Sequence, residues 1–270
     1  MSGMPDGVHP VRRPVGEDES RRANRADWDA YADEYQSTHG AFLRDVGFVW
    51  GPEGIDEGEL GVLGPVTGKH VLEIGCGAAQ CARWLTDRGA TAVGLDLALR
   101  QLQHSHRIDD ATGIAVPVVC GTATHLPFAD RSFDVAFSSF GALQFVEDIE
   151  RTVREVARVL RPGGRFGFSI THPIRWSMPD DPTKEGLVVT SSYWDRTPYV
   201  EEEESGRARY VEHHRTLGDW VGLLARAGFT ITDLVEPEWP EGHDRVWGGW
   251  GPERGALIPG TAIFGADLRR

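Results

Sequence analysis

The sequence has few cysteines and no long hydrophobic run. Its three cysteines, Cys76, Cys81 and Cys120, form no C-x-x-C pair, so neither a disulfide framework nor a zinc ribbon is indicated. No apolar stretch approaches the roughly 18 residues that a membrane-spanning helix requires. Residues 1–22 also lack the apolar segment of a signal peptide. We therefore expect a soluble, cytoplasmic protein with no membrane partner.

Positive charge is also scarce. The chain has 28 Lys and Arg residues against 41 Asp and Glu residues, a formal net charge of -13. This balance disfavours binding to phosphate backbones, so we expect no nucleic-acid partner. The histidines show no H-x-x-x-H spacing, and no metal site is expected. The partner we expect is a small molecule, and the protein itself is expected to be a monomer or a homodimer.

The chain is long enough for one large α/β domain. Residues 1–23 mix Pro, Gly and both charges without hydrophobic period, which predicts a mobile tail, and residues 24–270 form the domain. Aromatic residues then recur at helical spacing, which predicts an amphipathic helix that either packs on the domain or forms a lid over the site. These residues are Trp28, Tyr31, Tyr35 and Phe42.

Strand and helix patterns alternate from residue 69 onward. Strands are predicted at 69–75, 91–96, 116–120, 133–139, 165–171, 229–237 and 260–268, and helices at 78–89, 98–108, 148–164 and 216–228. This alternation predicts a parallel sheet covered by helices on both faces. Residues 172–215 interrupt it. Because they follow a central strand, where ligands bind in such sheets, we expect them to form a substrate cap.

The stretch "VLEIGCGAAQ" at 71–80 combines a buried strand, a glycine turn and a helix start. Gly75 and Gly77 allow the backbone to approach a ligand. The nicotinamide fingerprint requires a small residue where this chain has Gln80, so a pyrophosphate site is disfavoured. Glu73 could face a cation or be a buried structural acid. Asp96 ends the next strand, at the usual distance for binding ribose hydroxyls, and could also cap the following helix.

Four segments together carry a family resemblance: "VLEIGCGAA", "VGLD", "LPFADRSFDVAFSSFGALQFVED" and "RVLRPGGRF". In this order and spacing, the chain resembles the class I S-adenosylmethionine-dependent methyltransferases, particularly the small-molecule branch related to the ubiquinone-biosynthesis enzymes. The resemblance implies a Rossmann-like three-layer α/β sandwich. Its seven-stranded sheet would be mostly parallel, with an antiparallel last strand, and the cofactor would be S-adenosylmethionine.

The resemblance also implies which residues contact the cofactor. They are Glu73, Gly75, Cys76 and Gly77 at the methionine, Asp96 at the ribose, Leu97, Thr122 and Ala123 at the adenine, and Ser139 and Phe140 beside the sulfonium. Tyr31 and Tyr35 of the predicted N-terminal helix belong to the same predicted set. Thr122 stands where the family frequently has Asp, so adenine recognition is left to a hydroxyl or a backbone group.

Histidines are the candidate general bases. His172 directly follows the strand predicted at 165–171, and is either a base or a hydrogen-bonded loop residue. His213 and His214 precede the helix predicted at 216–228 and are weaker candidates. The predicted activity is in-line methyl transfer to an O, N or C atom of a small organic acceptor. The alternatives are a methyltransferase acting on tRNA or protein, and a non-catalytic S-adenosylmethionine-binding module.

Overall fold

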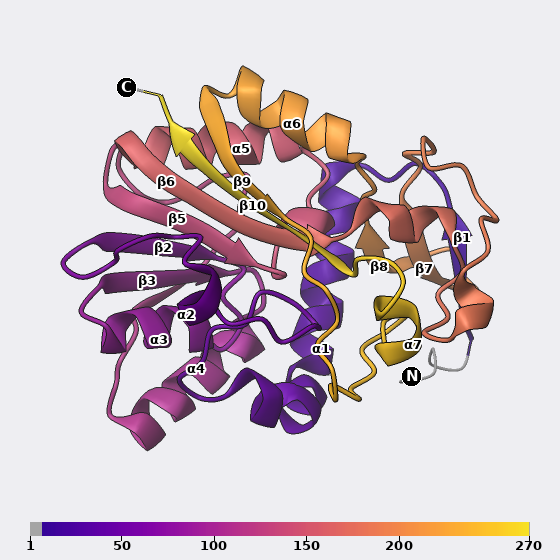
Figure 1. Ribbon diagram of the computed structural model, residues 1–270, viewed down its shortest axis with the longest axis horizontal. Coiled ribbons are helices and arrows are strands. Elements are labelled where there is room, and N and C mark those ends of the chain that lie inside the picture. The colour runs from indigo at the N-terminus through magenta and orange to yellow at the C-terminus, as the bar shows by residue number, and fades with distance from the viewer. Residues whose placement is uncertain (1–6, 270) are drawn as a thin grey trace.

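The protein is built around a seven-stranded sheet with the strand order β4-β3-β2-β5-β6-β10-β9 (Figure 1). The computed structural model describes residues 7–269. The strands are β2 (His70–Ile74), β3 (Thr91–Asp96), β4 (Val118–Cys120), β5 (Phe133–Ser139), β6 (Leu160–Thr171), β9 (Phe229–Val235) and β10 (Thr261–Leu268). Strand β10 runs antiparallel to both of its neighbours, and the other pairs are parallel. The predicted fold class is therefore confirmed.

Helices cover both faces of this sheet and make it the middle of three layers (Figure 1). The covering helices are α3 (Gln80–Asp87) and α4 (Leu99–Thr112) on one face and α5 (Ile149–Val159) and α6 (Leu217–Arg226) on the other. Val153 and Val156 of α5 are fully buried with Phe166 and Phe168 of β6. Apolar side chains thus line one face of each helix and both faces of the central strands, as a doubly covered sheet requires.

A second, three-stranded antiparallel sheet lies beside the first. It consists of β1 (Val8–Arg12), β7 (Tyr199–Glu203) and β8 (Ala208–Glu212), in the order β1-β7-β8. Residues 8–12 were expected in a mobile tail, and the structure corrects this, because they pair with β7. Residues 1–6 of that predicted tail lie outside the described residues. The predicted cap, 172–215, contains β7 and β8.

Helix α1 (Glu17–Leu43) joins the two sheets (Figure 1). It starts seven residues before the predicted domain boundary at 24 and runs along the free edge of β8. There the Asn24 amide donates to Val211 O at 3.0 Å and accepts from Val211 N–H at 2.8 Å. One side chain thereby satisfies the edge-strand groups that a further strand would otherwise pair. Across residues 7–269, α1 and every other helix are too short or too polar to cross a membrane.

Short elements complete the described chain. They are α2 (Glu57–Leu60), α7 (Pro252–Gly255), η1 (Leu143–Phe145), η2 (Pro173–Ser177) and η3 (Lys184–Gly186). Of these, η1 directly follows β5 and packs against α1, β6 and β8. It thus lies where the two sheets meet the ends of the central strands.

Candidate active site

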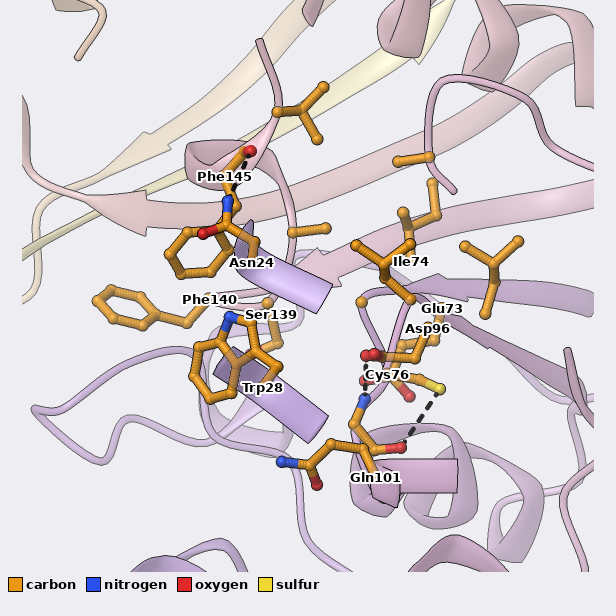
Figure 2. A pocket seen from close by; sticks show the side chains of 18 of the residues that line it. Asn24, Trp28, Glu73, Ile74, Cys76, Asp96, Gln101, Ser139, Phe140 and Phe145 are labelled. Carbon is orange, nitrogen blue, oxygen red and sulfur yellow. Dashed lines mark hydrogen bonds between the residues drawn. The ribbon is translucent and has the colours of Figure 1, made fainter. Parts of the chain in front are cut away.

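A cavity opens at the carboxyl ends of β2, β3, β4 and β5, beneath α1 (Figure 2). It comprises about 1370 Å³ of space between atoms, part of it open to solvent. Acidic residues lie on one side and aromatic residues on the other. The predicted residues that line it are Tyr35, Glu73, Gly75, Cys76, Gly77, Asp96, Leu97, Thr122, Ala123, Ser139 and Phe140. Residues predicted from separate motifs therefore surround one space.

The glycine turn after β2 forms the floor of the cavity. Gly75 has φ +72°, and a Cβ added there would lie 2.7 Å from Ala142 Cβ, so a larger residue would collide with the segment after β5. Gly77 has φ +52°, and its added Cβ would meet only Gln101 Oε1, at 3.8 Å. Gly75 is thus required by packing. At Gly77 the space beside the backbone stays open to the cavity.

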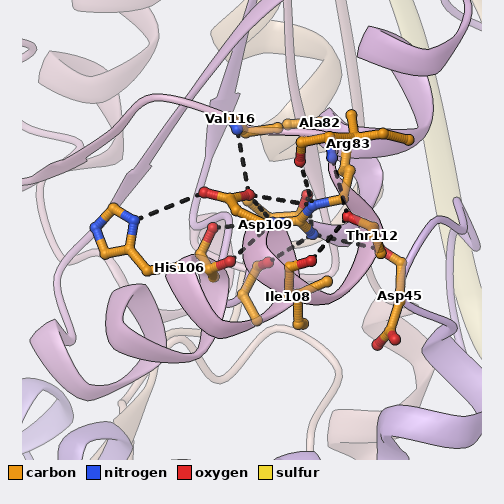
Figure 3. Close-up of polar contacts among 12 residues, drawn as sticks. Asp45, Ala82, Arg83, His106, Ile108, Asp109, Thr112 and Val116 are labelled. Carbon is orange, nitrogen blue, oxygen red and sulfur yellow. Dashed lines mark hydrogen bonds and ion pairs between the residues drawn. The ribbon is translucent and has the colours of Figure 1, made fainter.

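Arg83 of α3 stabilises this turn through hydrogen bonds and an ion pair (Figure 3). Its guanidinium is fully buried and donates to the carbonyls of Ala78 and Ala79 at 3.2 and 3.3 Å. It also pairs with Asp109 of α4 at 2.6 Å. Ala79 has φ +56°, a conformation that costs a non-glycine residue free energy. The buried guanidinium compensates by binding the carbonyls that this conformation presents.

Glu73 is the acid at the end of β2. It is 3 % exposed, and its Oε2 accepts a hydrogen bond from Ala82 N–H at 2.9 Å, so it caps the first turn of α3. Burial raises the pKa of Glu73 to about 8, although this hydrogen bond acts in the opposite direction. Both interpretations of Glu73 therefore have support, because it is a structural acid that also lines the cavity. A cation beside it would favour its ionised form.

Asp96 is the acid at the end of β3. Its two carboxylate oxygens accept hydrogen bonds from Gly77 N–H and Ala98 N–H, both at 2.8 Å. Burial raises the pKa of Asp96, while the backbone donors oppose that shift. These bonds fix the carboxylate across the turn after β2, and each oxygen keeps a lone pair for a ligand donor.

The end of β5 carries Ser139 and Phe140. Phe140 has φ +54°, and its N–H donates to Ser169 Oγ at 2.8 Å. Ser139 Oγ donates to Val49 O at 2.6 Å, so its hydroxyl hydrogen is already used within the protein. The left-handed conformation of Phe140 is strained for an aromatic residue, and such strain concentrates at functional sites. The Phe140 ring lies on the aromatic side of the cavity (Figure 2).

Helix α1 closes the cavity through side chains from several of its turns. Gln36 accepts from Gln80 Nε2 at 3.0 Å and donates to Gln101 Oε1 at 2.9 Å, which ties α1 to α3 and α4. Tyr35 lines the cavity, whereas Tyr31 does not. Tyr31 instead stacks edge-on against Tyr35 with ring centroids 5.9 Å apart, so it supports the lining residue. The helix thus both packs on the domain and covers the site.

The three candidate histidines do not line the cavity. His172 Nε2 lies 2.8 Å from Glu236 Oε1, and its Nδ1 accepts from Ile174 N–H, which matches the loop-histidine alternative. His214 Nε2 binds Tyr193 O at 2.7 Å. His213 lies nearest, since its Nε2 is 3.0 Å from the cavity residue Ser20, and burial lowers its pKa to about 3. All three are buried, and each is hydrogen-bonded within the protein through at least one ring nitrogen.

Several lining residues were not among the predicted site residues. Trp28, Gln36, Phe145 and Trp247 all face the cavity, and the Trp28 and Phe145 rings meet at 5.7 Å. Trp28 could have been found from its helical spacing with Tyr35, which lies seven residues later. Phe145 and Trp247 lie in η1 and in a loop, where no periodic pattern reveals which way a side chain points. Within residues 7–269, no three His, Cys, Asp or Glu side chains are grouped as a metal site would require.

Comparison with known proteins identifies the domain. Residues 72–168 match the family model described as a methyltransferase domain. The crystal structure of an S-adenosylmethionine-dependent methyltransferase from Mesorhizobium loti superposes with a TM-score of 0.60 at 28% identity, over 80% of this chain and 100% of that one. The chain carries a class I S-adenosylmethionine-dependent methyltransferase domain.

Other proteins similar to this methyltransferase domain carry several different names. The methyltransferase GfsG of Streptomyces halstedii is 31% identical over 63% of this chain and 55% of its own length. A demethylmenaquinone methyltransferase of Mycolicibacterium paratuberculosis is 43% identical over 38% of this chain and 42% of its own length. The chain thus spans about half the length of these relatives. The 1,6-didemethyltoxoflavin N1-methyltransferase of Burkholderia thailandensis, 18% identical with a TM-score of 0.62, shares the fold over 97% of this chain and 95% of that one.

Proposed function

We propose that the protein is an enzyme that transfers a methyl group from S-adenosylmethionine to an O, N or C atom of a small organic acceptor. The observation that carries this proposal is the convergence of four strand ends on one cavity, with Glu73 and Asp96 at two of these ends. The family model and the relatives' names support the reaction class.

The cavity wall suits a cationic adenosine cofactor. Glu73 and the open face at Gly77 would receive the methionine part, and Asp96 would hold the ribose hydroxyls. Cys76 would lie with Gly75 at the methionine, Leu97, Thr122 and Ala123 at the adenine, and Ser139, Phe140 and Tyr35 near the sulfur. When bound, the cofactor supplies a methyl group activated by a positively charged sulfur. The protein residues orient this group and exclude water from it.

The aromatic side of the cavity would bind the acceptor. Trp28, Phe140, Phe145 and Trp247 present flat apolar surfaces there, which favours a planar acceptor such as a phenol, a quinol or a heterocyclic amine. Holding this acceptor in line with the methyl group can supply on the order of 7 to 11 kcal/mol of barrier reduction by orientation alone. No cavity-lining histidine is needed for this contribution.

Calorimetry followed by a turnover assay tests the proposal. S-adenosylhomocysteine should bind and stabilise the protein, whereas NAD should not. Radiolabelled methyl groups should then pass to at least one member of a panel of small phenols, quinols and amines. Stabilisation by NAD alone would contradict the proposal. Labelling confined to tRNA or to protein would move the activity to a macromolecular acceptor, and tight binding without any labelled product would favour a non-catalytic module.

A further inference from the structure

The side chains that line the cavity differ between the centre of the sheet and its edge. The turn after β2 is followed outward by Asp96 after β3 and then by the segment 121–124 after β4, the outermost strand on that side. A nucleoside whose ribose is held at Asp96 can extend its base over this last segment. Leu97 and Ala123 provide apolar surface for the base there, so polar side chains near 121–124 decide which base fits.

Two threonine hydroxyls at this edge are hydrogen-bonded in series. Thr124 Oγ1 donates to Glu17 Oε1 at 3.0 Å, and Thr122 Oγ1 lies 3.0 Å from Thr124 Oγ1. A hydroxyl has a single hydrogen, and that of Thr124 is used by Glu17, so Thr122 must be the donor to Thr124. Both hydroxyl hydrogens therefore point along the series toward Glu17. The side chains of this edge keep only acceptor positions for a ligand.

Glu17 is the charged end of this series. It lies in the first turn of α1, is half-buried and lines the cavity together with Thr122 and Thr124. A carboxylate offers about four lone-pair sites, and the Thr124 hydroxyl occupies one of them. Arg21, which also lines the cavity, is paired with Asp18 at 2.8 Å. The Glu17 carboxylate thus retains acceptor capacity on the cavity side.

We propose that Glu17 accepts a hydrogen bond from the exocyclic amino group of adenine and selects this base over one with an oxygen at the same ring position. This inference rests on the proposed function, since it assigns a residue to the base of the same cofactor. Helix α1 would supply the carboxylate that the segment after β4 lacks, because that segment has Thr122 and Thr124 instead of an acid. An acceptor-only edge suits an amino group and repels a carbonyl oxygen.

Calorimetry with two ligands tests the assignment. The probes are S-adenosylhomocysteine and S-inosylhomocysteine, which carries an oxygen in place of the amino group. The wild-type protein should prefer the adenine compound by at least about tenfold, because the inosine compound would place two acceptors against each other. In Glu17→Gln, whose amide can turn an N–H toward that oxygen, the preference should fall to within about threefold. The ratio of two affinities measured on the same variant is insensitive to partial loss of folding.

Glu19→Gln is the matched control. Glu19 lies two residues away in the same turn, pairs with Arg13 at 2.7 Å and does not line the cavity, so the wild-type preference should persist. An unchanged preference in Glu17→Gln would overturn the inference while leaving the proposed function intact. Failure of the wild-type protein to bind either compound would overturn both. Loss of the preference in Glu19→Gln as well would overturn the assignment to Glu17 by showing a general charge effect.

Discussion

The cavity has two walls that are held by different kinds of contact. In the strand-end wall, Asp96 accepts from Gly77 and Ala98, which are 19 and 2 residues away, and Glu73 accepts from Ala82, 9 residues away. In the α1 wall, Asn24 binds Val211 across 187 residues of sequence. The first wall is thus assembled within one strand-turn-helix unit or between two successive ones. The second exists only when α1, η1 and the small sheet have come together.

This difference predicts distinct responses to substitution. Changes in the strand-end wall should alter cofactor binding directly, since the altered groups face the proposed cofactor. Changes in the α1 wall other than at Glu17 should act first on stability and on the acceptor side. Four substitutions, taken in order of decreasing effect, test the distinction.

Gly75→Ala should have the largest effect. The added Cβ would lie 2.7 Å from Ala142 Cβ, at a residue with φ +72°, so both strain and collision arise. We expect a loss of about 3 kcal/mol of stability and at least about 100-fold in S-adenosylhomocysteine affinity. Chemical denaturation and calorimetry measure the two. Gly113→Ala is the control, because Gly113 has φ +71° but no atom within 4 Å of an added Cβ, and should cost only about 1 kcal/mol.

Asn24→Ala should break the α1 wall. It leaves Val211 N–H and Val211 O without their side-chain partner and removes one of the two side-chain donors to Phe145 O, which should cost about 2 to 3 kcal/mol of stability. Affinity for S-adenosylhomocysteine at a temperature where the variant stays folded should change less than about threefold. Ser37→Ala, on the exposed side of the same helix, should change stability by under about 0.5 kcal/mol. A tenfold loss of cofactor affinity in Asn24→Ala would show that the walls are not separable.

Glu73→Gln should change the pH dependence of cofactor binding. The pKa of Glu73 is about 8 in the folded protein, above its ordinary value, so the fraction of carboxylate rises between pH 6 and 8. Because a carboxylate binds a cation better than a neutral acid does, affinity for S-adenosylmethionine should rise by about tenfold over that range. The variant should show no such rise in calorimetry. Glu57→Gln, which alters a buried acid outside the cavity, should retain it.

The same acid gives an expected trend in stability without cofactor. A carboxyl whose folded pKa lies above its unfolded pKa contributes most below the unfolded value, near 4.5, and that contribution is lost as the pH rises toward 8. Denaturation curves of the wild-type protein should therefore show a decline over this window that is smaller in Glu73→Gln. An identical decline in both proteins would contradict the raised pKa.

His172→Ala should have the smallest effect on turnover. The side chain is bound to Glu236 and to Ile174 N–H and does not line the cavity, so turnover should stay within about twofold of wild type. A tenfold loss of turnover with unchanged cofactor affinity would instead support His172 as a general base. His214→Ala, equally buried and bound to Tyr193 O, is the control for loss of packing.

The strand-end wall could be predicted closely from the sequence. Gly75 and Phe140 each follow an apolar strand directly and Asp96 ends one, and the carboxyl ends of parallel strands meet at one edge of a sheet. Their convergence therefore follows once the alternation of strands and helices is recognised. Hydrogen bonds between residues close in sequence, such as the one from Ala98 N–H to the Asp96 carboxylate, can also be predicted.

The α1 wall could be predicted only in part. Strand β7 reads "YVEEE", in which three of the five residues are glutamates, a residue type depleted in strands, and β7 pairs with β1 from the other end of the sequence. Glu17 was placed in a tail for the same reason, since its partner Thr124 is 107 residues away. Contacts between residues so far apart in the sequence depend on tertiary packing. The periodicity of hydrophobic residues within one segment does not reveal them.

The contact between Asn24 and Val211 also sets an order of events during biosynthesis. At about 5 to 20 residues per second, a ribosome makes Asn24 roughly 10 to 40 seconds before Val211, because 187 residues separate them. Helix α1 is therefore synthesised well before β8, the edge strand that it covers in the folded protein. The strands β2 to β5 are complete by Ser139, so the nascent chain can form the strand-end wall well before the wall that closes over it.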